Sequence, residues 1–220
     1  VIRPKEPRIP NLDAPLSLKG DAQARYLNFV QRLNKEHLEA RPGEADLEAR
    51  IQSFELAARM QIAASEVGNL SGESKATLDL YGVNDANETK AGFAKNCLLA
   101  RRLIERGVRF VQLFNGSYAM GEGVGNWDGH KTIEQQYSVH GPILDQPVAG
   151  LLKDLKARGL LQDTLVVWGG EFGRTPVAQG SDGRDHNPHG FTVWLAGGGC
   201  KPGTADRKST RLNSSHLVLS

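Results

Sequence analysis

Three loop segments of this 220-residue chain carry acidic and histidine side chains of the kinds that bind metal ions. The first segment contains Asp128 and His130, two residues apart in a glycine-rich loop. A carboxylate oxygen and an imidazole nitrogen at this spacing can turn toward one ion. An equally weighted structural interpretation is that Asp128 forms a turn or caps a helix while His130 is simply exposed.

The second segment follows an apolar run that ends at Trp168. Glu171 stands three residues beyond that run, between glycines that allow close backbone approach, and it could bind a metal or act as a base. Arg174 could hold a sulfate or phosphate oxyanion in the fork of its guanidinium group. The structural alternative is an ion pair between Glu171 and Arg174 that shapes the turn.

The third segment places His186 and His189 three residues apart, directly after Asp185. Two histidines at this spacing favour a ligand pair, and a neighbouring carboxylate can hydrogen-bond to a ligating imidazole from behind. A lone histidine would usually be incidental, but several histidines and acids share these loops. The predicted metal ligands are Asp128, His130, Glu171 and His186, with His189 and Asp185 as lesser candidates and Arg174 as an oxyanion holder.

Alternating helices and apolar runs predict how these loops are positioned. Helical patterns at residues 93–106 and 143–158 end at glycines, and the apolar runs 108–114 and 164–168 follow them. A third run, 191–196, precedes three glycines. Near-continuous apolar runs are typical of strands buried on both faces of a parallel sheet. The sequence therefore predicts an α/β fold with a mostly parallel sheet and a ligand site beyond the carboxyl ends of its strands.

The remaining segments set the predicted domain boundaries. Residues 1–20 hold four of the ten prolines and indicate an extended segment. The helical pattern of residues 21–67 is interrupted at Pro42-Gly43. Residues 206–220 are polar and serine-rich, which predicts a non-native or disordered tail. One domain is therefore expected over residues 21–205.

Composition gives no support for nucleic acid or a membrane as a partner. The net charge of +2 gives no argument for nucleic acid or an acidic membrane surface. No apolar run approaches the roughly 20 residues that span a bilayer. Two cysteines, Cys97 and Cys200, are too few for a disulfide framework. The chain begins at Val1 without a signal-peptide pattern, so we expect it to be truncated at its N-terminus.

Longer motifs resemble the DUF1501 family of bacterial proteins. The resemblance is carried by Asn126-Trp-Asp-Gly-His130, by the run from Thr164 to Pro176 containing Gly-Glu-Phe-Gly-Arg-Thr-Pro, and by Gly183-Arg-Asp-His186. Weaker similarity at residues 47–61 and 98–111 extends the resemblance over about residues 20 to 205.

This resemblance implies a place in the alkaline phosphatase-like superfamily, beside the sulfatases. The implied fold is a three-layer α/β/α sandwich, N-terminally truncated here, with a helical segment before the core strands. The implied chemistry uses one or two divalent ions, zinc or calcium, and a Ser, Thr or formylglycine nucleophile. That nucleophile belongs to early strands that this chain lacks, so the isolated chain is expected to be inactive. Phe172 stands where relatives carry a ligand, which removes one ligand of the two-metal set.

The resulting functional prediction is part of a metal-dependent sulfate or phosphate ester hydrolase. Its substrate would be a small-molecule or carbohydrate ester. Export is expected because relatives often begin with a twin-arginine signal. The alternative is a non-catalytic exported binding module that retains the hydrolase fold and one metal ion.

Overall fold

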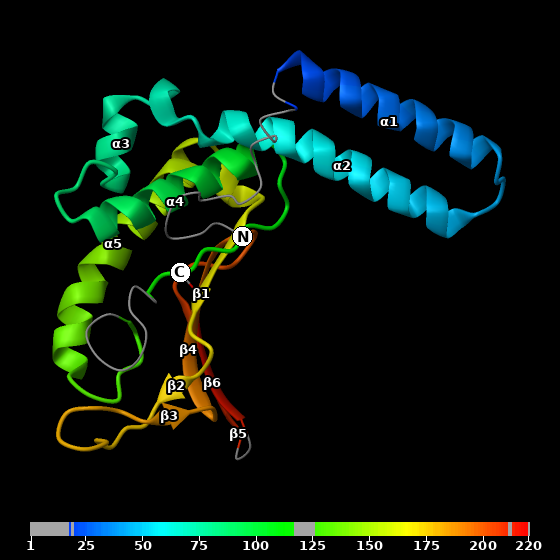
Figure 1. Ribbon diagram of the computed structural model, residues 1–220. Helices are drawn as coiled ribbons and strands as arrows, with labels where there is room; N and C mark the ends of the chain where they lie inside the picture. The colour runs from blue at the N-terminus through cyan, green and yellow to red at the C-terminus, as the bar shows by residue number, and fades with distance from the viewer. Residues whose placement is uncertain (1–17, 19, 117–125, 211–212, 220) are drawn as a thin grey trace. The chain divides into compact units, whose positions relative to one another are not determined.

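The computed structural model describes residues 18, 20–116, 126–210 and 213–219 (Figure 1). Within these residues, five α-helices and six β-strands belong to two compact units. One unit lies within Glu6–Gly72 and the other within Glu73–Ser220. No helix of the described part is long and apolar enough to cross a membrane.

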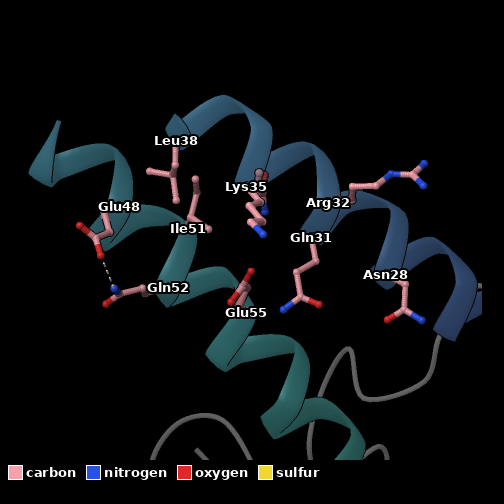
Figure 2. A pocket seen from close by; sticks show the side chains of 10 residues that line it. Asn28, Gln31, Arg32, Lys35, Leu38, Glu48, Ile51, Gln52 and Glu55 are labelled. Atoms are coloured by element: carbon pink, nitrogen blue, oxygen red, sulfur yellow. Dashed lines mark hydrogen bonds between the residues drawn. The ribbon is translucent and has the colours of Figure 1, made fainter. Parts of the chain in front are cut away.

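The first unit is a helical hairpin of α1 (Asp21–Glu39) and α2 (Ala45–Gly68). The predicted interruption at Pro42-Gly43 is confirmed, because these residues form the turn, where Gly43 has a φ of 89°. A groove between the helices is lined mainly by polar side chains, including Lys35 and Glu55 (Figure 2). Charges of both signs along an open groove are typical of a solvated helix surface, so the groove offers no convergent set of ligands.

The second unit contains three helices that pack mainly on one another: α3 (Lys75–Tyr81), α4 (Glu88–Glu105) and α5 (Ile133–Ala157). The side chain of Asn87 caps α4 by accepting hydrogen bonds from two backbone amides of its first turn. The predicted glycine stops are confirmed, since Gly107 and Gly159 follow α4 and α5 with φ values of 80° and 74°. A side chain at Gly150 would press against the backbone of Leu80, so this glycine allows α3 and α5 to approach closely.

A buried ion network holds these helices together. The guanidinium group of Arg101 on α4 lies 2.6 Å from carboxylate oxygens of Glu73 and Glu105, and its Nε lies 2.9 Å from Asp154 on α5. Tyr81 on α3 donates its hydroxyl to Asp154 at 2.9 Å. Burial, with the neighbouring Asp154 carboxylate, raises the pKa of Tyr81 and keeps its hydroxyl protonated. The network therefore anchors α5, the helix that follows Asp128 and His130 in the chain.

The main sheet has the strand order β1-β4-β6-β5. Its strands are β1 (Leu165–Gly169), β4 (Gly190–Gly197), β5 (Thr204–Thr210) and β6 (Asn213–Leu219). Strand β1 pairs antiparallel with β4, so that Trp168 faces Trp194, while β6 is parallel to β4 and antiparallel to β5. A separate antiparallel pair joins β2 (Gly173–Arg174) to β3 (His186–Asn187). Figure 1 shows this pair beside β4.

The prediction of a three-layer α/β/α sandwich with a mostly parallel sheet is wrong. Two of the three pairings in the main sheet are antiparallel. The chain returns from β1 to β4 through the short β2–β3 hairpin, whereas a parallel return would need a crossover segment, usually a helix. The helices of this unit also contact one another more extensively than they contact the sheet.

Individual strand predictions had mixed outcomes. The runs 164–168 and 191–196 correspond to β1 and β4, so both strands are confirmed. Strand β1 is not buried on both faces, because Leu165 and Val167 remain 49% and 59% exposed. No strand forms at residues 108–114. The tail predicted from residue 206 coincides with most of β5 and with β6, and the extended segment predicted at 1–20 lies outside the described residues except for Leu18 and Gly20.

Candidate metal centre

Three predicted ligands, from chain segments more than 50 residues apart, converge at one point in the second unit: Asp128, His130 and His186. His130 Nε2 lies 3.0 Å from His186 Nε2 and 3.0 Å from Asp128 Oδ1. His186 Nε2 lies 3.4 Å from the same Asp128 oxygen. Two imidazole nitrogens and one carboxylate oxygen thus face a common point, as the ligands of a single ion do.

A tight turn before α5 presents Asp128 and His130. The side chain of Asn126 accepts a hydrogen bond from the Asp128 amide at 2.8 Å, which makes Asn126 the residue that forms the turn. Gln136, in the first turns of α5, donates its side-chain amide to the carbonyls of Asp128 and Lys131 at 3.3 and 3.2 Å. Helix α5 therefore holds this turn in place through the Gln136 side chain.

The β2–β3 pair supplies the third predicted ligand, His186. His186 on β3 lies directly opposite Arg174 on β2 in the pairing register. The loop between these strands packs against the turn: the Arg184 amide donates to the carbonyl of Gly129 at 2.8 Å. Gly183 lies under the backbone of His130 so closely that a Cβ at this position would overlap the His130 carbonyl oxygen. A glycine is therefore required where the two segments meet.

Arg174 pairs with the Asp128 carboxylate. Its Nη2 donates to Asp128 Oδ1 at 2.9 Å, and this hydrogen bond is the main reason that the pKa of Asp128 lies below its ordinary value. Arg174 also donates to the backbone carbonyls of Trp127 and Arg184, at 3.4 and 3.2 Å. Its fork is thus occupied by Asp128 and the backbone, and the alternative ion pair predicted with Glu171 is replaced by one with Asp128.

Groups around the two histidines limit their orientation. His130 Nδ1 lies 2.6 Å from Gln179 Oε1 and 4.0 Å from Asp185 Oδ1. Asp185 Oδ1 accepts a hydrogen bond from the backbone amide of His186 at 2.7 Å. The ring of Phe172 packs on the His186 ring, with a centroid separation of 4.1 Å.

The other predicted residues are placed differently. Glu171 is exposed and is not a member of the converging group found among the described residues. His189 is also exposed and outside that group. Asp185 is not a member of the group either, but its Oδ1 lies 4.0 Å from His130 Nδ1. Sequence reasoning missed Gln179 and Asn126, because neither amide belongs to a metal-ligand pattern. The one available signal for Asn126 was its turn-forming residue type two positions before Asp128.

Comparison with known proteins gives one match. The family model described as "Protein of unknown function (DUF1501)" matches residues 1–214. No curated protein and no solved structure matches the chain. Since the match spans nearly the whole sequence, the chain belongs to the DUF1501 family.

Proposed function

We propose that Asp128, His130 and His186 bind one divalent metal ion, and that this ion serves in the hydrolysis of a phosphate or sulfate ester. The observation that carries the metal proposal is the set of distances among the three ligand atoms. Ligands about 2.0–2.1 Å from a tetrahedral zinc ion stand about 3.3 Å from one another. The separations here are 3.0, 3.0 and 3.4 Å, so an ion fits with little rearrangement.

The donor atoms favour zinc over calcium. Calcium takes six to eight oxygen ligands in proteins, whereas two imidazoles and a carboxylate suit zinc and other transition metals. The same ligand set also occurs in non-haem iron(II) sites, so the metal content of the protein is the first quantity to measure. Asp128 is suited to binding, because an aspartate is ionised at neutral pH and its Oδ1 faces both histidines.

The ester-hydrolase part rests on the resemblance to the alkaline phosphatase-like superfamily and on the charge next to the site. A zinc ion with three protein ligands supplies a Lewis acid for a phosphoryl or sulfuryl oxygen. Arg174 contributes by holding the Asp128 carboxylate in position. A role for Arg174 as an oxyanion holder requires it to exchange one of its present backbone partners for the substrate. Export from the cytoplasm is part of the same proposal, and fractionation of the native host would test it.

One observation favours a second candidate function, a metal-holding binding module without catalysis. Within the described residues, no hydroxyl or thiol hydrogen-bonds to the side chains of the three ligands, and apart from one another these side chains hydrogen-bond to the side chains of Arg174 and Gln179. Glu171 also lies outside the group. If the site is catalytic, a metal-bound water or a group outside this hydrogen-bonded set acts as the nucleophile.

Metal analysis tests the site directly. The purified chain is dialysed against zinc and measured by elemental analysis and calorimetry, together with Asp128→Asn, His130→Gln and His186→Gln. We expect one zinc per chain, with each substitution weakening binding at least 100-fold. His37→Gln on α1 and the exposed His189→Gln serve as matched histidine controls and should bind normally. A wild-type chain that binds no zinc, or that binds it equally well in all variants, would rule out this site.

Activity separates the two functions. The full-length protein, loaded with metal, is assayed on p-nitrophenyl phosphate and p-nitrophenyl sulfate. The hydrolase proposal expects turnover that is lost in His186→Gln and retained in His189→Gln. Metal binding at the expected stoichiometry without turnover of either ester would instead support the binding module.

A further inference from the structure

We propose that Gln179 is a positioning residue for the metal centre, which fixes the tautomer of His130 so that its Nε2 lone pair faces the ion. This inference rests on the proposed metal site and names a residue that controls it. Gln179 belongs to the loop between β2 and β3, and its Oε1 lies 2.6 Å from His130 Nδ1. An amide oxygen can only accept a hydrogen bond, so Nδ1 must carry the proton.

The consequence falls on the opposite side of the ring. A neutral imidazole with its proton on Nδ1 has an unprotonated Nε2, which is the form that binds a metal. This Nε2 points at Asp128 Oδ1, 3.0 Å away, and a carboxylate oxygen is a hydrogen-bond acceptor. Two hydrogen-bond acceptors then lie 3.0 Å apart and repel each other, and a bound cation would remove this repulsion. His186 Nε2, at 3.0 Å from His130 Nε2, can donate into this gap only until the ion displaces its proton.

The loop backbone keeps Gln179 in place. Gln179 and Gly183 exchange two backbone hydrogen bonds, at 2.9 and 3.1 Å, which close the tip of the loop. The same loop is tied to the ligand turn, because the Ile133 amide donates to the carbonyl of Asp182 at 3.4 Å and the Arg184 amide donates to that of Gly129. Gln179 is exposed, so its side chain contributes little to a core. Among the described residues, this side chain hydrogen-bonds to His130 Nδ1.

Substitution separates positioning from folding. Gln179→Met keeps the length of the side chain and removes the acceptor, whereas Gln179→Glu keeps an acceptor oxygen. Hydrogen-bond partners behind a ligating histidine typically change metal affinity by about 10- to 100-fold. We expect Gln179→Met to weaken zinc binding by at least about 10-fold, and Gln179→Glu to bind within about threefold of wild type. Gln162→Met, at an exposed glutamine in the short helix η3 (Leu160–Gln162), is the matched control and should bind normally.

A spectroscopic readout tests the tautomer without metal. Long-range ¹H–¹⁵N NMR of the metal-free chain distinguishes the two imidazole tautomers, and the His130 signals are assigned by their loss in His130→Gln. We expect the Nδ1–H form in wild type and Gln179→Glu, and a shift toward the Nε2–H form in Gln179→Met. If Gln179→Met binds zinc like wild type and keeps the Nδ1–H form, the role of Gln179 is overturned while the metal site stands. If wild type binds no zinc, the metal proposal fails, and the spectra still decide whether Gln179 sets the tautomer.

Discussion

Replacing Arg101 with methionine should destabilise the helical part of the second unit by about 3 kcal/mol. The Arg101 side chain is only 2% exposed, and it pairs with Glu73 and Asp154, which are 7% and 9% exposed. Breaking a buried ion pair by removing one partner typically costs about 3–5 kcal/mol, because a charge is left in a medium that solvates it poorly. The lower end of this range applies here. Glu73 keeps a contact with Arg102, and Asp154 keeps one with Arg158 at 2.7 Å, so neither carboxylate loses every cation.

Urea unfolding followed by far-ultraviolet circular dichroism measures this change. With a slope of about 2–3 kcal/mol per molar urea, a loss of 3 kcal/mol lowers the midpoint by about 1–1.5 M. Arg109→Met, at an exposed arginine after α4, is the control and should shift the midpoint by less than about 0.3 M. Adding Glu73→Gln to Arg101→Met should recover part of the loss, because the buried charge is then removed. An Arg101→Met midpoint equal to that of the control would refute the buried network as a source of stability.

Two more changes test the contacts around the site. Gly183→Ala should separate the β2–β3 loop from the His130 turn, because the new Cβ would overlap the His130 carbonyl oxygen. Zinc affinity measured by calorimetry should then fall more than about 10-fold. The control Gly141→Ala, whose new Cβ meets open space on α5, should leave zinc affinity unchanged. Acid should weaken the fold through Glu73: burial alone would raise its pKa, but hydrogen bonds from Arg101 and Arg102 outweigh burial and lower it. The stability contributed by ionised Glu73 is complete above about pH 4.3, the pKa of an unfolded glutamate, and is lost as the pH falls through the lower pKa of Glu73 in the folded protein. In urea unfolding, wild type should therefore lose more stability than Glu73→Gln between pH 5 and pH 3.

Helices α1, α2 and α4 and the C-terminal part of α5 were predictable because their signals are local, whereas α3 and the first ten residues of α5 were not predicted. The apolar spacing of residues 21–67, the break at Pro42-Gly43 and the glycines after α4 and α5 each act within one or two turns of the chain. The pairing direction of the strands is not local. An apolar run such as 164–168 has the same composition in a parallel and an antiparallel sheet, so only its partner decides, and β1 pairs with β4.

The three converging side chains, Asp128, His130 and His186, could be singled out from the sequence because acids and histidines of the types that bind metals recur in neighbouring loops. Which of two neighbouring side chains would face the site was not predictable. Glu171 and Phe172 are adjacent in the bend between β1 and β2, and their residue types do not decide which of the two turns inward. The register in which Arg174 faces His186 turns Phe172 toward His186, and Glu171 is left exposed.

This register changes the significance of Phe172. As a residue type that cannot bind a metal, it counts only as a missing ligand of a two-ion site. Packed at 4.1 Å on His186, it instead limits how that imidazole can rotate, and the guanidinium group of Arg174 lies 5.6 Å from the centre of the same ring. The aromatic ring therefore packs on a proposed ligand and lies beside Arg174, which hydrogen-bonds to Asp128. A second ion beside His186 would have to displace this ring, and Glu171 would have to turn inward to bind it. Both arguments favour a centre for one ion, held by Asp128, His130 and His186.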